Sequence, residues 1–466
     1  MVFSSPIFFL FFAVYLALHF LVPAKHRVWL IVIGSTFFYG YYRPEYVWIP
    51  LTLTLVAYLG AIHLDNSASL RSRKLRLAGT ITMIFIPLMI YKYADFLYIS
   101  IAGPLLGREE PIVNQPLPLG ISFVTFTLIA YVVDVCKERF PVERSFKFLF
   151  AYILFFPQLI AGPILKPGEL IPQLEDPQPA KNGAFTYGAI IFTLGLVKKL
   201  IFADSIAVIV DSVYSAAPNS LHITDYLVAI YGFPMQIYCD FSGYTDMALG
   251  LGYILGITLP NNFARPYAAA SPIEFWRRWH ITLSFWLRDY LYIPLGGNRE
   301  GRFKEMRNIL ITMTLGGLWH GANWTFVIWG VMHGIGIVVC HIVRKSGWGG
   351  YVKRMPAWLG ALLTFHFVTL LWVFFRAPDF ASAYNIITGP FFTTLGDVTA
   401  FASLNGFTIA ILLFFYVTHR YDDHAHFYYF IHKLPKSIVW VGIMFMFLLA
   451  VALSGGNSAA FIYFDF

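Results

Sequence analysis

Near the middle of the chain the sequence reads Ser271-Pro-Ile-Glu-Phe-Trp-Arg-Arg-Trp-His280 and continues to Arg288, Asp289 and Gly297. A strongly apolar stretch follows, with His320 at its centre. Ionisable side chains at membrane depth are costly, so where they persist they usually face a protein interior or a watery cavity. The sequence therefore predicts a buried polar site surrounded by membrane-spanning segments.

The composition excludes an ordinary soluble protein. Hydrophobic residues make up 58% of the 466 positions, aromatic residues 18% and charged residues 12%, and the mean hydropathy is +0.65. Such a chain is typical of a polytopic membrane protein. Segments long enough to cross roughly 30 Å of hydrocarbon lie near residues 3–22, 28–42, 46–63, 79–101, 117–135, 147–164, 184–214, 226–258, 309–343, 357–375, 406–418 and 435–453. We expect one all-α membrane domain over residues 1–466, with roughly 11–12 transmembrane helices.

Helix-breaking residues interrupt the segment near 226–258. They are Gly232, Pro234, Gly243, Gly250, Gly252 and Gly256. Breaks at membrane depth are tolerated only where protein or a cavity satisfies the freed backbone groups. We therefore expect broken or re-entrant helices in this segment.

The formal net charge of +8 needs no nucleic-acid partner. Basic residues gather in alternate loops, as expected where they set the orientation of the chain in the membrane. Those loops are expected to be cytoplasmic, with the N-terminus outside. The first apolar run lacks a basic leader region and a small-residue cleavage site, so we expect it to remain as an anchor.

The segment around His280 is predicted to be one amphipathic helix. At about 100° per residue its positions form two opposite stripes: Trp276, Trp279, Leu283, Trp286 and Tyr290 on one side, and Arg277, His280, Ser284 and Arg288 on the other. The alternative interpretation is an interfacial helix with Trp and Arg at the lipid headgroups and no further role.

His320 is the candidate general base. It lies three residues before Asn323, a spacing that predicts neighbouring positions on one helical face. A neutral imidazole in a desolvated site can accept a proton, because burial disfavours its charged form. The alternative is a histidine that only ties helices together by hydrogen bonds. His333 is given that structural role.

Four motifs then make the chain recognisable. They are Gln236-Ile-Tyr-Cys-Asp-Phe-Ser-Gly-Tyr-Thr-Asp246, Asn262-Phe-Ala-Arg-Pro-Tyr267, the block from Glu274 to Arg299, and Gly317-Leu-Trp-His-Gly-Ala-Asn-Trp324. In order and spacing they resemble the bacterial membrane-bound O-acyltransferase family, and within it the alginate O-acetyltransferase membrane subunits and their peptidoglycan-acetylating relatives. Pro157–Pro163, Lys198, Lys199 and Asp204 also look familial.

This resemblance implies a ring of membrane helices around a central funnel, with a catalytic core at about 225–345. An acyl donor would reach the site from the cytoplasm, and the acceptor would lie on the outer side. The family's invariant histidine matches His320, which is treated as the catalytic base in related enzymes. Its second conserved histidine matches His280.

Transfer from a thioester to a hydroxyl needs a base and a donor that steadies the tetrahedral oxyanion. His320 is the expected base. The candidate hydrogen-bond donors to the oxyanion are Asn323, the indoles of Trp319 and Trp324, and His280. The side chains expected to bind the acyl donor are Arg277, Arg278, Arg288, Trp276, Trp279, Asp240 and Gln236. The arginines would hold the phosphates of coenzyme A or of an acyl-carrier prosthetic group, or else lipid headgroups. Asp240, Asp246 and Asp289 are expected to pair with basic side chains.

The aromatic tail over residues 454–466 ends in Phe461-Ile-Tyr-Phe-Asp-Phe466. It resembles a C-terminal motif of this family and of a small partner protein in teichoic-acid D-alanylation, where a tyrosine is implicated as an acyl relay. Tyr463 is therefore a candidate relay, with its phenol attacking the thioester. The alternative is an aromatic membrane anchor. Asp465 stands where the relatives are expected to carry a neutral amide.

A second polar cluster is expected to hold no metal. Its members are His419, Asp422, Asp423, His424, His426 and His432. Their spacing fits no zinc pattern, and structural or headgroup roles are favoured.

The sequence thus predicts a multi-pass inner-membrane O-acyltransferase, with no bound cofactor, that moves acetyl from a cytoplasmic thioester to an extracytoplasmic polysaccharide such as alginate. The donor would be acetyl-CoA or an acyl-carrier thioester, and a periplasmic acetyltransferase would be its partner. One alternative is transfer of D-alanyl or another acyl group from a carrier protein to a cell-envelope polymer. The other is a non-enzymatic polymer or lipid exporter.

Overall fold

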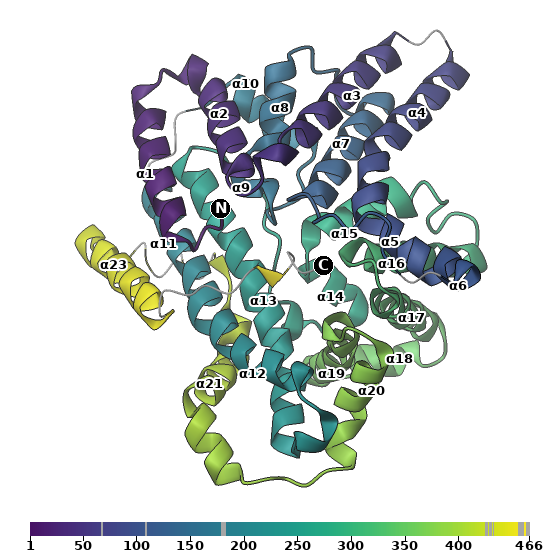
Figure 1. Ribbon diagram of the computed structural model, residues 1–466, viewed down its shortest axis with the longest axis vertical. Coiled ribbons are helices and arrows are strands. Elements are labelled where there is room, and N and C mark those ends of the chain that lie inside the picture. Colours follow the sequence, from purple (N-terminus) through teal and green to yellow (C-terminus); the bar gives the residue numbers. More distant parts are fainter. Residues whose placement is uncertain are drawn as a thin grey trace. The chain divides into compact units, whose positions relative to one another are not determined.

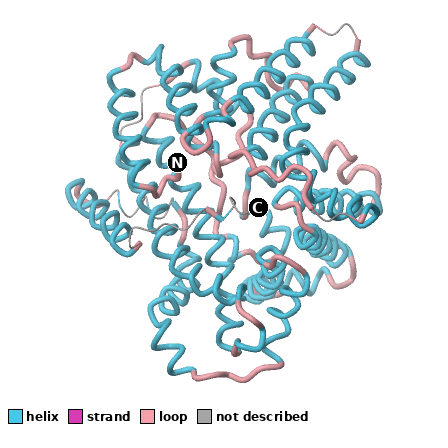
Figure 2. Tube along the Cα trace, in the orientation of Figure 1, coloured by secondary structure: helices cyan, strands magenta, loops and turns pink. Residues whose placement is uncertain are grey.

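The computed structural model describes residues 1–66, 69–107, 110–178, 183–424, 427, 431, 433–454 and 461–462. Within these residues the regular elements are all helical (Figure 2). The chain divides into two compact units, Met1–Phe192 with Met247–Pro260, and Thr193–Asp246 with Asn261–Phe466. The all-α class expected from the sequence is confirmed.

The first unit carries the N-terminal helices (Figure 1). They are α1 (Pro6–Leu21), α2 (Arg27–Gly40), α3 (Trp48–Asp65), α4 (Leu70–Leu88), α5 (Ala94–Leu97), α6 (Gly103–Leu106), α7 (Ile121–Cys136), α8 (Phe146–Leu154), α9 (Phe156–Leu159) and α10 (Pro167–Glu175). Helices α3, α4 and α7 pack against one another, and α2 packs against α8. The buried ring of Phe156 contacts the rings of Phe8, Phe11, Tyr15 and Phe38, so aromatic packing holds this unit together.

The second unit carries every candidate site residue that the structure describes. Its helices are α12 (Asp204–Ser215), α14 (Pro272–Arg278), α15 (Ile281–Leu287), α16 (Arg302–His320), α17 (Trp324–Lys345), α18 (Gly349–Arg354), α19 (Ala357–Arg376), α20 (Phe380–Thr388), α21 (Val398–Thr418) and α23 (Lys436–Leu453). Helices α11 (Ala184–Val197) and α13 (Ile223–Ile254) contribute residues to both units.

Six helical stretches among the described residues are long and apolar enough to cross a membrane. They are Pro44–Asp65, Leu70–Leu106, Trp324–Lys345, Ala357–Arg376, Val398–Tyr421 and Lys436–Leu453. Pro6–Leu21 and Ile121–Cys136 are shorter apolar helices. The chain is therefore a multi-pass membrane protein. The total number of spans and their arrangement around a funnel remain predictions from the sequence.

The expectation of a broken helix around Pro234 is wrong, because α13 runs unbroken for 32 residues with this proline inside it. Proline removes one backbone donor and so weakens the helical hydrogen bonds near it. Tyrosine hydroxyls from elsewhere in the chain bind two nearby carbonyls of the same helix. Tyr416 donates to the carbonyl of Tyr231 at 2.5 Å, and Tyr267 donates to the carbonyl of Pro234 at 2.6 Å.

Gly243 of α13 serves close packing and does not break the helix. A Cβ atom at this position would lie 2.7 Å from the carbonyl oxygen of Gly195 and 3.1 Å from the backbone nitrogen of Lys199. Only a residue without a side chain lets the two backbones approach this closely. The approach brings α13 against the π-helical segment Lys198–Ala203 (η5).

The apolar run near 309–343 forms two helices, so the expectation that His320 and Asn323 share one helical face is wrong. Helix α16 ends at His320, and Gly321 is extended at φ −156° and ψ 145°. The Asn323 side chain accepts the backbone N–H of Thr325 at 3.1 Å and so caps the start of α17. Asparagine is a favoured N-cap residue, because its side-chain oxygen satisfies a free amide of the first turn.

Helices α16 and α17 pack closely where Gly317 faces Gly330. A Cβ atom at Gly317 would lie 3.0 Å from the Cα of Gly330. A Cβ atom at Gly330 would strike the carbonyl oxygen of Met313. Small residues at such a crossing let membrane helices associate through their backbones. The hairpin that presents His320 therefore depends on these two glycines.

Gly330→Ala is expected to destabilise the protein by about 1–3 kcal/mol, because the added methyl group overpacks the helix crossing. Thermal unfolding of the detergent-solubilised protein measures the change. Gly442→Ala in α23 is the matched control, because nothing lies within 4 Å of a Cβ atom at that position. Equal melting temperatures for the two variants would contradict the close packing.

Candidate functional site

The segment expected to be one amphipathic helix is broken at His280. Helix α14 ends at Arg278 and α15 begins at Ile281. The backbone of His280 is left-handed, with φ 42° and ψ 56°. Such a conformation is rare for a residue with a side chain and costs free energy, so the surrounding structure must enforce it. The two opposite stripes predicted from helical periodicity therefore do not form.

The backbone of the segment that begins at Asn262 enforces this break. The carbonyl of Arg278 accepts the N–H of Ala264 at 2.9 Å. The N–H of Ile281 donates to the carbonyl of Asn262 at 3.0 Å. A continuous helix would have satisfied both groups internally. Long-range hydrogen bonds thus replace local ones, which is why periodicity alone misjudged this segment.

The side chain of Asn262 fixes the orientation of the His280 ring. Its Oδ1 accepts the backbone N–H and the hydroxyl of Thr282 at 3.2 and 3.0 Å, and it lies 3.2 Å from His280 Nδ1. Because this oxygen is an acceptor, the hydrogen bond places the ring proton on Nδ1 and makes Nε2 the accepting nitrogen. Burial lowers the pKa of His280 to about 3, so the imidazole is neutral near pH 7.

His320 lies beside His280 at the end of α16. Both side chains are buried, and their ring centroids are 6.5 Å apart. Aromatic rings surround His320 at centroid distances of 5.0 Å for Trp319, 5.1 Å for Trp329 and 5.3 Å for Phe375. Two histidines that are 40 positions apart in the sequence thus share one enclosed, largely apolar site.

Of the predicted tryptophans, Trp319 lies at the histidine pair, whereas Trp276 and Trp279 pack against other residues. Trp319 contacts both histidines, with its ring centroid 6.0 Å from that of His280. Trp279 is buried and packs at 4.9 Å on Trp372. Trp276 donates its indole N–H to Nδ1 of His333 at 3.2 Å, which agrees with the structural role expected for His333.

Two of the expected oxyanion donors lie in other surroundings. The Asn323 side chain, besides capping α17, donates to the carbonyl of Pro378 at 2.8 Å. Trp324 is 50% exposed at the start of the same helix. The enclosed site therefore favours Trp319 among the side chains proposed for that role.

The three arginines lie at or near the surface. Arg277 and Arg288 are exposed, and Arg278 is partly exposed and paired with Glu274 at 2.5 Å. Arg288 pairs with Asp289 at 2.7 Å. They do not share a helical face with the buried His280, because the helix is interrupted there.

Two adjacent lysines of the π-helical segment are each held by two carboxylates. Lys198 pairs with Asp246 at 2.9 Å and with Asp422 at 2.8 Å. Lys199 pairs with Asp204 at 2.8 Å and with Asp240 at 2.7 Å. The expectation that Asp240, Asp246 and Asp289 pair with basic side chains is confirmed. Buried charges are tolerated because they are paired in this way.

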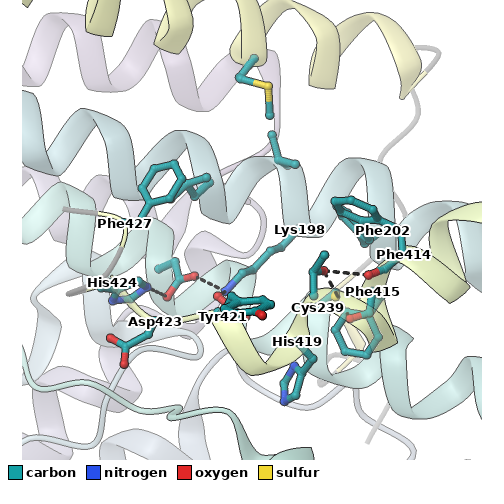
Figure 3. Close-up of a pocket in the computed structure, with 16 residues that line it drawn as sticks. Lys198, Phe202, Cys239, Phe414, Phe415, His419, Tyr421, Asp423, His424 and Phe427 are labelled. Carbon is teal, nitrogen blue, oxygen red and sulfur yellow. Dashed lines mark hydrogen bonds and ion pairs between the residues drawn. The ribbon is translucent and has the colours of Figure 1, made fainter. Parts of the chain in front are cut away.

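A cavity of about 360 Å³ lies beside the first of these clusters (Figure 3). Lys198, Asp422 and His424 line its charged side, while Phe202, Phe414, Phe415 and Met446 belong to its apolar wall. Neither His280 nor His320 lines it. Asp422 and His424 of the second polar cluster thus belong to a network of ion pairs with Lys198 and Asp246.

The charges of this loop shift two pKa values. Burial alone would raise the pKa of Asp422, but Lys198 and a hydrogen bond from Tyr238 lower it to about 2. Burial alone would lower the pKa of His424, but its contact with Asp246 at 3.0 Å raises it above the usual value. Within the described part of the chain, no group of three or more His, Cys, Asp or Glu could hold a metal ion. His426 and His432 lie outside the described residues.

Sequence reasoning missed Asn262 as a site residue. The signal was present, since Asn262 opens one of the motifs quoted for the resemblance. Gln236 was predicted to bind the donor. Its side chain is buried, and Oε1 has no hydrogen-bond partner among the residues that the structure describes. Tyr463 lies outside those residues.

The fold and site define a multi-pass, all-α membrane protein that encloses a histidine pair among aromatic rings. Residues 135–376 match the model of MBOAT, the membrane-bound O-acyltransferase family. The chain belongs to this family, and it is an O-acyltransferase.

The similarity to individual relatives reaches beyond residues 135–376. This chain is 36% identical to the probable alginate O-acetylase AlgI of Pseudomonas putida, with 100% of both chains covered. It is 36% identical to the peptidoglycan O-acetyltransferase of Helicobacter pylori over 79% of this chain and 74% of that protein. A teichoic acid D-alanyltransferase of Bacillus subtilis is 29% identical over 60% of this chain and 76% of that protein.

Asn262→Ala is expected to lower acyl transfer on the order of 10²-fold, because the His280 ring would lose the group that orients it. Initial rates with purified protein in lipid vesicles measure the loss. Asn261→Ala is the matched control, because the neighbouring asparagine is exposed. A fully active Asn262→Ala variant would show that the orientation of His280 does not matter.

Proposed function

We propose that the protein moves an acetyl group from a cytoplasmic thioester across the inner membrane for O-acetylation of an extracytoplasmic polysaccharide. The observation that carries this proposal is the enclosed pair of His280 and His320 within the family-matched residues. The relatives named for alginate and peptidoglycan O-acetylation support acetyl as the group and a polysaccharide as the final acceptor.

His320 is the proposed general base. It takes the proton of the attacking hydroxyl, and the imidazolium that forms lies at the C-terminal end of the 19-residue helix α16. The helix dipole favours positive charge at that end. A site of aromatic rings excludes water and strengthens electrostatic interactions within it. Trp319, which contacts both histidines, is the proposed source of the indole N–H that steadies the oxyanion.

His280 assists through its orientation. With Nδ1 donating to Asn262, its Nε2 accepts a hydrogen bond and does not donate one. We therefore do not assign His280 the role of oxyanion donor. Because the single proton of the attacking hydroxyl goes to His320, His280 is proposed to accept a hydrogen bond from another polar group of the bound substrates.

The acyl group is proposed to travel through Tyr463. The phenol oxygen attacks the thioester carbon as the base removes its proton, and a new C–O bond forms. The C–S bond then breaks, and the leaving thiolate takes up a proton to become a free thiol. A hydroxyl acceptor on the outer side attacks the resulting aryl ester, and the phenol is regenerated. The acceptor would be presented by a periplasmic acetyltransferase.

The donor is acetyl-CoA or an acyl-carrier thioester in this proposal. Both carry phosphate, which guanidinium groups bind well. The exposed Arg277 and Arg288 and the partly exposed Arg278 are accessible for this contact, outside the enclosed histidine site. They would capture the phosphates at the surface while the thioester reaches inward.

A second candidate is transfer of D-alanyl or another acyl group from a carrier protein. The likeness to a teichoic acid D-alanyltransferase supports this candidate. The non-enzymatic exporter considered from the sequence is set aside, because the chain belongs to a family of acyltransferases.

His320→Ala is expected to lower acetyl transfer by about 10²- to 10⁴-fold, the usual contribution of a general base. The readout is the acetyl ester content of surface polysaccharide in cells that carry each variant, with folding checked by thermal unfolding. His366→Ala is the control, because His366 is an exposed histidine of α19. Normal acetylation by a folded His320→Ala variant would remove the proposed base.

Peptide mass spectrometry after incubation with donor is expected to find an acyl adduct on Tyr463. The mass of the adduct identifies the group, because acetyl and D-alanyl differ in composition. Tyr463→Phe lacks the nucleophilic oxygen and should abolish both the adduct and the transfer. Full transfer by Tyr463→Phe would show that the donor and the acceptor react directly.

A further inference from the structure

Phe461 and Ile462 lie in the protein interior. Phe461 is 1% exposed and Ile462 is 7% exposed. The backbone N–H of Ile462 donates to Oδ2 of Asp240 at 2.7 Å, in a fully buried hydrogen bond. This contact joins residues 222 positions apart.

The acceptor of this hydrogen bond is itself held rigidly. Asp240 is buried, and its other oxygen pairs with Nζ of Lys199 at 2.7 Å. Lys199 in turn pairs with Asp204 at 2.8 Å. A hydrogen bond to an ionised carboxylate is roughly twice as strong as one between neutral groups. The Lys199 ammonium therefore fixes the carboxylate of Asp240, and that carboxylate fixes the backbone of Ile462.

The same segment contacts the histidine site through one aromatic ring. Phe461 packs on Tyr244 at 4.9 Å and on Phe241 at 6.0 Å between ring centroids. Phe241 in turn contacts the ring of His280, edge to face at 4.7 Å. Asp240 and Phe241 are adjacent in α13. One turn of this helix thus binds Phe461 and Ile462 and packs against His280.

We propose that Asp240, held by Lys199, is the positioning residue that directs the C-terminal segment toward the histidine pair. The inference rests on the proposed relay, because Tyr463 follows the anchored Ile462 directly in the sequence. Asp240 does not touch the reacting atoms. It sets the point from which the chain continues, and one extended residue spans only about 3.3–3.6 Å. Loss of the anchor at Ile462 is therefore expected to slow the proposed acyl transfer to Tyr463, the next residue in the sequence.

Hydrogen–deuterium exchange of the C-terminal peptide in the full-length protein tests the anchor without reference to activity. Asp240→Leu removes the acceptor and should speed exchange of this peptide by roughly tenfold or more. Asp204→Leu is the matched control, because it also leaves Lys199 with one carboxylate but keeps the contact of Asp240 with Ile462. Equal protection of the peptide in the two variants would overturn the anchor.

The rate of acyl-adduct formation on Tyr463 tests the positioning role. Asp240→Leu should lower this rate on the order of 10²-fold at saturating donor. Ile462→Pro, which lacks the N–H but keeps the ion cluster, should do the same, and Ile462→Val should not. Unchanged adduct formation in both Asp240→Leu and Ile462→Pro would overturn the positioning role and leave the relay intact.

The two proposals fail separately in this design. If the tail is protected as expected but Tyr463 carries no adduct even in the parent protein, the relay is wrong and the anchor stands. If Asp240→Leu fails to fold, Ile462→Pro still decides the positioning role, because its charged residues are untouched.

Discussion

The hydrogen bonds between Asn262 and the chain break at His280 are the constraint on which the site depends. A left-handed residue with a bulky side chain persists only where its neighbours over-determine it. Asn262 does this twice, through its backbone carbonyl to Ile281 and through its side chain to Thr282 and His280. The strained turn directs the imidazole inward, against Phe241 and toward His320. In a regular helix His280 would lie on the same side as the exposed arginines.

A second constraint comes from charge. Lys198 and Lys199 are consecutive residues of a π-helical segment, so their side chains leave it in different directions. One lysine joins α13 to the loop after α21 through Asp246 and Asp422. The other joins α13 to the tail through Asp240. Buried lysines that are each shared by two carboxylates are costly to separate from them, and these two hold distant parts of the chain against α13.

Enclosure of the two histidines has a consequence for the reaction. Both rings are buried, and aromatic side chains surround His320. In the proposed reaction this enclosure would keep water from the acyl group and so protect a reactive ester from hydrolysis. The cavity beside Lys198 shows that the second unit also holds space for apolar groups next to paired charges.

The sequence alone determined the all-α membrane class and the pairing of Asp240, Asp246 and Asp289, because these follow from hydrophobicity and from the cost of a buried charge. The catalytic roles of His280 and His320 stay predictions from the motifs. Periodicity failed at His280 and after His320, and the helix-breaking residues around Pro234 did not break their helix. At His280 the segment that begins at Asn262 replaces local backbone hydrogen bonds, and after His320 the side chain of Asn323 caps a new helix. Beside Pro234 the distant Tyr267 binds a carbonyl of the unbroken helix. Only the tertiary structure decided these outcomes and the hydrogen bond from Ile462 to Asp240. The energy of such contacts depends on which distant residues fold together.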